Sequence, residues 1–219
     1  EDRRVVVRLD LNVPVENGVV TDTTRMDAVV PFLQKLSFAG AKLVLLSHFG
    51  EKGESLAPVA EELKRKLNFV SFIQSTNQEI IANEVQKITT GNALLLENVR
   101  LFPGETENLA SLALFFASLG DIYINDAFSV SHRNHASVTG VATHLLSFIG
   151  PTCARELTHL SPILTPKKPA LLLIGGAKIS TKLSLINRYL DQGVQVFVGG
   201  AMVHNILLAR GLSVGKSLF

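Results

Sequence analysis

The chain has 219 residues, of which 47% are hydrophobic and 18% are charged, so it can bury a sizeable core and is not intrinsically disordered. A single cysteine excludes an internal disulfide framework and a zinc site built from cysteines. The net charge of +2 is too small to indicate nucleic-acid binding. No apolar run approaches the ~20 residues that a membrane-spanning helix needs, and no segment resembles a signal peptide. We therefore expect a cytoplasmic protein that binds neither nucleic acid nor membrane.

Short, nearly continuous apolar runs recur along the chain, and amphipathic stretches with helical spacing lie between them. Such runs are typical of strands that are covered on both faces. They occupy residues 4–9, 42–46, 93–96, 121–124, 170–174 and 194–198. The amphipathic stretches occupy residues 24–38, 57–67, 79–88, 109–119, 154–164, 179–190 and 202–210. This alternation predicts an α/β protein with a parallel sheet, flanking helices and right-handed crossovers.

Three prolines within residues 161–169 indicate the end of a helix followed by a linker. We therefore expect a first domain over residues 1–153, an interdomain helix and linker over 154–169, and a second domain over 170–219. This last segment has only about 50 residues, too few to close a doubly wound sheet. We expect this second α/β domain to be truncated.

Ligands of open α/β sheets bind beyond the carboxyl ends of the strands, so the residues after each apolar run are site candidates. In the first domain these positions are rich in Arg and His. They include Asp10, Asn12, Ser47, His48, Glu97, Asn98, Arg100, Asn125, Asp126, Ser131, His132, Arg133 and His135, and Arg25 lies at the start of the first helix. Cations gathered at one edge repel one another unless an anion lies between them, and the arginine fork matches phosphate or carboxylate oxygens. One arginine alone is better explained by a surface salt bridge, but the set favours an anion site.

A second group of candidates is glycine-rich. The segment IGGAKISTK, residues 174–182, follows a predicted strand and begins a predicted helix. Gly175 and Gly176 let the backbone approach a phosphate, and Lys178 and Lys182 are spaced to share a helix face. Gly199 and Gly200 follow the next strand and give a weaker signal. A tight structural turn explains the segment equally well. Residues 166–219 carry 7 basic and 1 acidic residues, which suits an anionic ligand but is more simply a solvated surface.

Other chemistries lack their residue patterns. The chain has no HExxH motif, and no third ligand is evident beside His132 and His135, so the sequence predicts no metal site. It has no GxSxG elbow for a serine hydrolase and no GxGxxG loop for a dinucleotide-binding dehydrogenase. Its basic residues are not interleaved with aromatic residues, which argues against nucleic-acid stacking.

Seven segments, in chain order, together resemble the phosphoglycerate kinase family. They are RLDLNVP (8–14), DTTRM (22–26), LLSHFG (45–50), LLLENVR (94–100), INDAFSVSHRNHAS (124–137), IGGAKISTK (174–182) and VGGAM (198–202). The resemblance implies two Rossmann-like domains joined by a helix and a hinge, in a cytoplasmic, monomeric glycolytic enzyme. It implies reversible phosphoryl transfer between 1,3-bisphosphoglycerate and ADP, giving 3-phosphoglycerate and ATP. Mg²⁺ would be carried with the nucleotide, and its protein ligand would lie outside this chain.

The resemblance also implies roles for individual residues. Asp10 and Asn12 would contact the glycerate, and a basic patch of Arg25, His48, Arg100 and Arg133 would hold the triose. Arg25 would also reach the transferring phosphoryl group, and Lys178 would stabilise it, so these two residues are the catalytic candidates. The nucleotide phosphates would be bound by Lys178, Lys182, Gly175, Gly176, Gly199 and Gly200.

The sequence departs from the family pattern at two positions that the resemblance makes relevant. The family has an arginine of the basic patch where this chain has Glu51, followed by Lys52. A carboxylate that faces a phosphate is repulsive, so Glu51 must turn away, Lys52 must substitute, or affinity must fall. The family's third glycine is here Ala201.

Two function classes remain open. The first is an enzyme, a phosphoglycerate kinase of which this chain alone is poorly active or inactive, because the rest of the nucleotide site is missing. The second is a non-catalytic module that binds a phosphorylated acid, which Glu51 favours slightly. Lys178 and Lys182 favour the enzyme, since a glycerate binder has no use for them.

Overall fold

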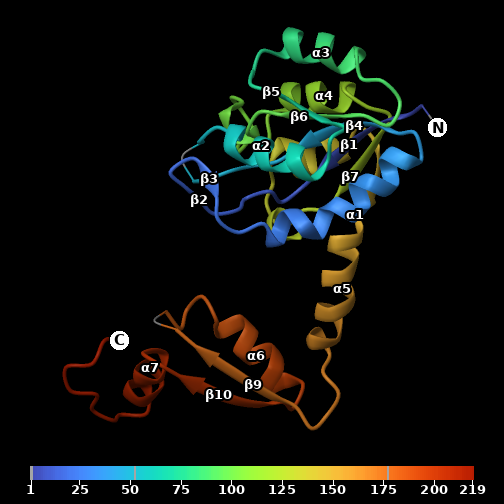
Figure 1. Cartoon of the computed structure of the whole chain (residues 1–219). Helices are drawn as coiled ribbons and strands as arrows, with labels where there is room; N and C mark the ends of the chain where they lie inside the picture. The colour runs from blue at the N-terminus through green and yellow to red at the C-terminus, as the bar shows by residue number, and fades with distance from the viewer. Residues whose placement is uncertain (1, 52, 177) are drawn as a thin grey trace. The chain divides into compact units, whose positions relative to one another are not determined.

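A computed structural model describes residues 2–51, 53–176 and 178–219 of the chain. It divides into two compact units, Glu1–Leu157 and Thr158–Phe219. Helix α5 (Pro151–Leu164) runs from the first unit into the second (Figure 1). The two units are described separately below.

The first unit is built on a six-stranded sheet with the strand order β5-β6-β4-β1-β7-β8, and every neighbouring pair is parallel. Its strands are β1 (Arg4–Arg8), β4 (Lys42–Leu46), β5 (Val70–Ile73), β6 (Ala93–Leu96), β7 (Ile122–Asn125) and β8 (Leu146–Ile149). The parallel α/β sheet that the apolar runs predict is therefore confirmed. The sequence analysis does not predict β5 and β8, which are the two edge strands of the sheet.

Helices cover both faces of this sheet, as expected (Figure 1). Helices α1 (Thr24–Phe38) and α2 (Ala57–Lys66) pack on the face to which Val5 and Val7 of β1 contribute. Helices α3 (Gln78–Gln86) and α4 (Ala110–Ser118) pack on the opposite face, with Val6. Successive residues of a strand point to opposite faces, so one apolar run supplies both cores. Among the described helices, none is long and apolar enough to cross a membrane.

Short elements complete the first unit. The hairpin of β2 (Val15–Glu16) and β3 (Val19–Val20) turns through Asn17 and Gly18, whose φ angles of 52° and 77° suit a two-residue loop. Three short helical turns lie beside the sheet: η1 (Val99–Leu101), η2 (Phe128–Val130) and η3 (Ala136–Gly140). Each of the three follows β6 or β7 in the chain, so they shape the carboxyl end of the sheet.

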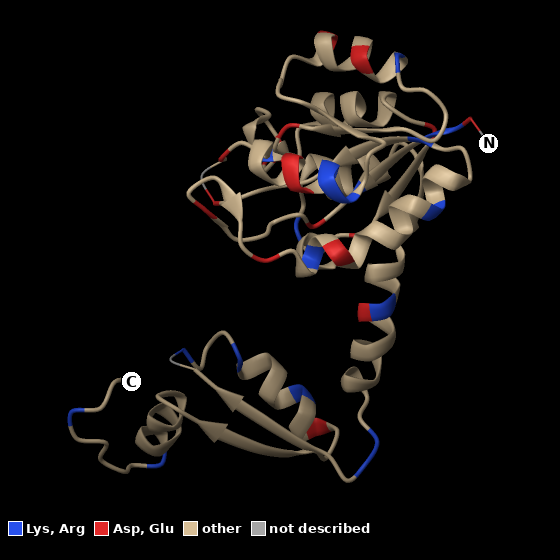
Figure 2. Cartoon of the chain, viewed as in Figure 1, with Lys and Arg blue, Asp and Glu red and all other residues tan. Residues whose placement is uncertain are grey.

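The second unit has a two-stranded parallel sheet of β9 (Leu171–Gly175) and β10 (Gln195–Gly199), with α6 (Leu183–Asp191) and α7 (Met202–Ala209). Lys and Arg residues outnumber acidic residues along this part of the chain (Figure 2). Leu171, Leu173 and Phe197 are more than half exposed, so the sheet retains an uncovered apolar surface. This small core agrees with the expectation that residues 170–219 do not close a sheet.

Candidate functional site

The carboxyl ends of four parallel strands bring the polar residues of the first unit together. β1 lies between β4 and β7, and β6 lies beside β4. The loops after these strands carry Asp10, His48, Arg100 and Ser129, so residues far apart in sequence meet at one edge of the sheet. The chain crosses from β6 to β7 on the other side of β1, and such a switch of direction is where open α/β sheets form ligand crevices.

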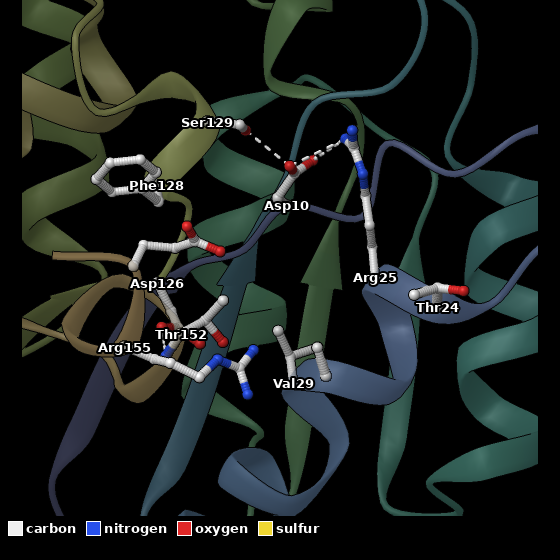
Figure 3. A pocket seen from close by; sticks show the side chains of 11 residues that line it. Asp10, Thr24, Arg25, Val29, Asp126, Phe128, Ser129, Thr152 and Arg155 are labelled. Carbon is white, nitrogen blue, oxygen red and sulfur yellow. Dashed lines mark hydrogen bonds and ion pairs between the residues drawn. The ribbon is translucent and has the colours of Figure 1, made fainter. Parts of the chain in front are cut away.

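Asp10 and Arg25 both line one cavity, of about 330 Å³, at this switch. Arg25 Nη1 donates to both carboxylate oxygens of Asp10, at 3.1 and 3.0 Å, and to the carbonyl oxygen of Asn12 at 3.2 Å. Ser129 Oγ donates to Asp10 Oδ2 at 2.7 Å (Figure 3). Half of the Arg25 side chain is exposed, so this ion pair is weak and the guanidinium can also bind a ligand anion.

Asn12 connects two of the loops. Its Oδ1 accepts a hydrogen bond from the backbone N–H of Gly50 at 2.9 Å. Its own N–H donates to Asp10 Oδ1 at 3.3 Å. These contacts fix the loop after β4 against the end of β1, so Asn12 organises the loops around the site.

A second cavity, of about 460 Å³, is the basic one. It is lined by Glu51, Gly53, Arg100, Thr106, Arg133 and His135. Arg100 donates to the carbonyl oxygen of Gly50, and neither Arg100 nor Arg133 forms an ion pair with an acid of the described residues. Two arginines without neutralising partners favour an anion in this cavity.

The departure from the family pattern lies in this basic cavity. Glu51 is exposed and lines it with Arg100 and Arg133. The sequence analysis considered Lys52 as a substitute for the arginine, but Lys52 lies outside the described residues. Glu51 therefore places negative charge at the mouth of an otherwise positive site.

His48 does not add to this positive charge. It is buried, and burial together with the nearby guanidinium of Arg8 lowers its pKa to about 3. Burial likewise lowers the pKa of His135. The expectation that every Arg and His at this edge is a cation is therefore wrong for His48, which is neutral near pH 7.

Glu97 and Asn98 hold the loop after β4 instead of facing a ligand. Glu97 accepts hydrogen bonds from Ser55 Oγ and from the N–H groups of Leu56 and Asn98, each at 2.8 Å. Both side chains are buried. Although they follow a strand as ligand-binding residues do, their function here is to fix the loop that carries Glu51.

The sequence analysis missed a buried group behind the site. Arg8, Glu105 and Ser137 are all buried, and Ser137 is hydrogen-bonded to both Arg8 and Glu105. The sequence does contain a signal for this group, because Arg8 is the one charged residue in the otherwise apolar run VVVRL, residues 5–9. A charge in such a run is retained only with buried partners.

Asp126 caps helix α5, and its replacement with alanine is expected to lower the free energy of unfolding by about 1–2 kcal/mol. Its Oδ1 accepts hydrogen bonds from the N–H groups of Thr152 and Cys153, at 2.7 and 3.1 Å. Burial raises the pKa of Asp126, so the charge itself adds little. Asp126→Asn keeps the acceptor and should lose much less, as urea unfolding would measure. Equal losses in the two variants would contradict the cap.

In the second unit, two glycine loops lie against each other. Gly176 (φ 146°) and Gly200 (φ 65°) both have φ angles that favour glycine. The N–H of Met202 donates to the carbonyl oxygen of Gly176 at 3.0 Å, and a Cβ on Gly200 would lie 3.5 Å from Gly176 backbone atoms. The loops after β9 and β10, which carry Gly175 and Gly199, are therefore adjacent.

The lysines of this unit lie differently from the expectation. Helix α6 begins at Leu183, so Lys178 is in a loop and Lys182 is the residue before the helix, and they do not share a helix face. Thr181 Oγ1 donates to the carbonyl oxygen of Lys178 at 3.0 Å, a local bond that competes with helix formation. Both lysines are exposed and free to reach a ligand. Among the described residues, no cluster of three or more His, Cys, Asp or Glu could hold a metal ion.

Comparison with known proteins gives one family. The family model described as phosphoglycerate kinase matches residues 1–219. The phosphoglycerate kinases of Rhizobium meliloti (strain 1021) and Sinorhizobium fredii (strain NBRC 101917 / NGR234) are 44% identical over 224 residues and 42% identical over 226 residues. Each alignment covers 99% of this chain and 56% of the relative. The chain spans about half the length of the curated relatives that it matches.

Solved structures agree. Phosphoglycerate kinase from Coxiella burnetii matches with a TM-score of 0.86 and 41% identity, over 99% of this chain and 57% of that one. The enzyme from Pyrococcus horikoshii OT3 matches with a TM-score of 0.82 and 25% identity, over 98% of this chain and 57% of that one.

Proposed function

Because the chain belongs to the phosphoglycerate kinase family, we propose that it supplies the glycerate site and part of the nucleotide site of that enzyme. The reaction is the reversible transfer of a phosphoryl group between 1,3-bisphosphoglycerate and ADP, giving 3-phosphoglycerate and ATP in glycolysis. The observation that carries the proposal is the basic cavity, where Arg100 and Arg133 lie together and neither forms an ion pair with an acid in the described part of the chain. Residues 1–153 would bind the glycerate, 154–169 would link the units, and 170–219 would begin the nucleotide-binding domain.

Different residues of the first unit would bind different parts of the substrate. Arg100 and Arg133 would bind phosphate oxygens, because their guanidinium groups are permanent cations with forked donors. Asp10 and Asn12 would contact the glycerate hydroxyl and carboxylate region. His48 would donate a hydrogen bond as a neutral ring. Arg25 would leave Asp10 in part to meet the phosphoryl group, which its weak, half-exposed ion pair permits.

The residues of the second unit would bind the nucleotide. Gly175, Gly176, Gly199 and Gly200 offer backbone N–H groups without side chains to obstruct a phosphate. Lys178 would stabilise the transferring phosphoryl group, and Lys182 would bind nucleotide phosphates. Phosphoryl transfer needs positioning and positive charge around a loose transition state, not a protein nucleophile, and these residue types suit it.

Mg²⁺ would accompany the nucleotide. No group of three or more His, Cys, Asp or Glu among the described residues could hold a metal ion, and the proposal places no step on a metal held by this chain. When bound to the nucleotide, the metal neutralises phosphate charge. We further propose that the protein is a cytoplasmic monomer whose two domains close over the substrates and exclude water.

A binding module without catalysis is the second candidate, and Glu51 is the observation that favours it. Calorimetric titration of the chain with 3-phosphoglycerate and, in parallel, with ADP tests the proposal. Binding of 3-phosphoglycerate supports the site in the first unit. A folded chain that binds no 3-phosphoglycerate would overturn it, and Glu51→Arg would then show whether the carboxylate is the cause.

Arg133→Ala is expected to weaken 3-phosphoglycerate binding by about 2 kcal/mol, roughly 30-fold, because a charge-assisted pair of hydrogen bonds is lost. Arg65→Ala is the matched control. Arg65 is an exposed arginine of α2 that pairs with Glu62, away from the cavity. The same calorimetric titration measures both variants. An affinity unchanged in Arg133→Ala would remove Arg133 from the site.

A further inference from the structure

Arg8 lies directly behind the glycerate site and is 1% exposed. Its Nε donates to Ser137 Oγ at 3.1 Å, and its Nη1 donates to the carbonyl oxygen of Leu9 at 2.5 Å. The remaining nitrogen, Nη2, lies 3.4 Å from Nδ1 of His48. The guanidinium plane is therefore fixed by two contacts while it faces the imidazole with the third.

Ser137, which accepts the hydrogen bond from Arg8, is itself held by Glu105 and Tyr123. Ser137 donates both its backbone N–H and its hydroxyl to the carboxylate of Glu105, at 2.9 and 2.5 Å. Tyr123 donates its hydroxyl to the carbonyl oxygen of Ser137 at 2.9 Å. Ser137 thus lies between a buried cation and a buried anion, and a shift of Arg8 would break a satisfied network.

In the contact between Arg8 and His48, Arg8 must be the hydrogen-bond donor and His48 the acceptor. A guanidinium offers five N–H donors and no acceptor, so the facing Nδ1 must present its lone pair. In a neutral imidazole the proton is then on Nε2. We infer that Arg8 is a positioning residue that holds His48 as the neutral Nε2–H tautomer, whose N–H donates to the anion bound at this end of the sheet. This inference rests on the proposed function, because it treats His48 as a ligand contact.

The charges around His48 support the neutral form. Arg8 on β1, Arg100 after β6 and Arg133 after β7 all disfavour a second proton, whereas Asp10 favours it. Burial acts in the same direction as the arginines and lowers the pKa of His48 to about 3. His48 therefore remains neutral throughout the physiological pH range, and its contribution to binding is a directed hydrogen bond, not a charge.

The tautomer can be measured directly in the full chain. Two-bond ¹⁵N–¹H correlation spectra of protein labelled in its six histidines distinguish the Nε2–H, Nδ1–H and protonated rings, and His48→Gln identifies the His48 signals by their disappearance. We expect the Nε2–H pattern in ligand-free protein near neutral pH. An Nδ1–H pattern, or a protonated ring, would overturn the inference whether or not any ligand binds.

Arg8→Met tests the cause. We expect the His48 signals to become those of a tautomer mixture and the affinity for 3-phosphoglycerate to fall by about tenfold, the effect of one lost hydrogen bond. The double variant Arg8→Met/Glu105→Gln removes both buried charges and serves if the single variant folds poorly. An unchanged tautomer in a folded variant would overturn the role of Arg8. An Nε2–H ring in a wild-type chain that binds no 3-phosphoglycerate would instead overturn the proposed function and the ligand contact with it.

Discussion

Arg8→Met is expected to lower the free energy of unfolding by about 3–5 kcal/mol near neutral pH, because it removes one of two interacting buried charges and leaves the other uncompensated. Arg8 and Glu105 are each 1% exposed, and both are hydrogen-bonded to the hydroxyl group of Ser137. Methionine has a similar length and fills the space with an apolar chain. The loss therefore measures the stranded carboxylate of Glu105 and not a cavity.

The effect should depend on pH in a defined direction. Burial raises the pKa of Glu105 above its ordinary value, and Arg8 opposes that rise. A folded-state pKa above the unfolded value means that the folded state binds more protons in the interval between the two values, so stability falls as pH rises through it. Removal of Arg8 raises the pKa of Glu105 further and widens this interval. We expect the difference between Arg8→Met and the wild type to be smaller at about pH 5 than at about pH 7.5.

Urea unfolding at the two pH values measures both expectations. The control is Arg8→Met/Glu105→Gln, in which Ser137 Oγ, released from Arg8, can accept a hydrogen bond from the glutamine amide. Replacing both members of a buried pair is often nearly neutral, so this variant should recover most of the lost stability. If the double variant is as unstable as Arg8→Met at both pH values, the Arg8 cation does not neutralise Glu105.

The order of strands and helices could be predicted because burial on both faces leaves a strong pattern. Runs such as KLVLL in β4 and ALLL in β6 are almost entirely apolar, and they are interior strands. The edge strands β5 (VSFI) and β8 (LSFI) each contain a serine and have exposed residues, so they lack that signature. An edge strand has one neighbour and less apolar contact, and its sequence is correspondingly less distinctive.

The site could be predicted in part, for a related reason. Arg25, Arg100 and Arg133 could be named as candidates for an anion site from their types and their places after strands or at a helix start. What each residue contacts depends on tertiary geometry. The same strand-end rule selects Glu97 and Asn98, which bind backbone groups of a loop, and it does not select Arg8, which lies within a strand. The state of His48 depends on burial and on three arginines from separate segments, and no local pattern contains that information.

The second large effect is expected for Asn98→Asp, which should cost about 3–5 kcal/mol of unfolding free energy and weaken glycerate binding. Asn98 is fully buried, and its amide hydrogen-bonds in both directions. Nδ2 donates to the carbonyl oxygens of Phe49 and Glu54, at 2.7 and 2.6 Å. Oδ1 accepts from the N–H groups of Phe49 and Arg100, at 3.2 and 3.1 Å.

Aspartate has the same shape as asparagine, but a carboxylate oxygen replaces the Nδ2 donor. Its second oxygen would face two carbonyl oxygens that have lost their donor, and each buried acceptor left unpaired costs about 1–3 kcal/mol. Protonation of the new carboxyl group would restore one donor, so the folded-state pKa of this group should be raised. Stability should consequently fall as pH rises from the ordinary pKa of an aspartate toward neutrality.

The link to binding follows from what the amide holds. Phe49 and Glu54 lie in the loop that carries Glu51, and the N–H of Arg100 is bonded to the same side chain. A loosened loop would let Glu51 and Arg100 change their positions at the basic cavity. The affinity for 3-phosphoglycerate should therefore fall, as measured in the absence of urea, where the variant is still folded. Asn83→Asp, an exposed position in α3, is the matched control and should change stability by less than about 0.5 kcal/mol. Equal stability of Asn98→Asp and Asn83→Asp would show that the loop is held by Glu97 alone.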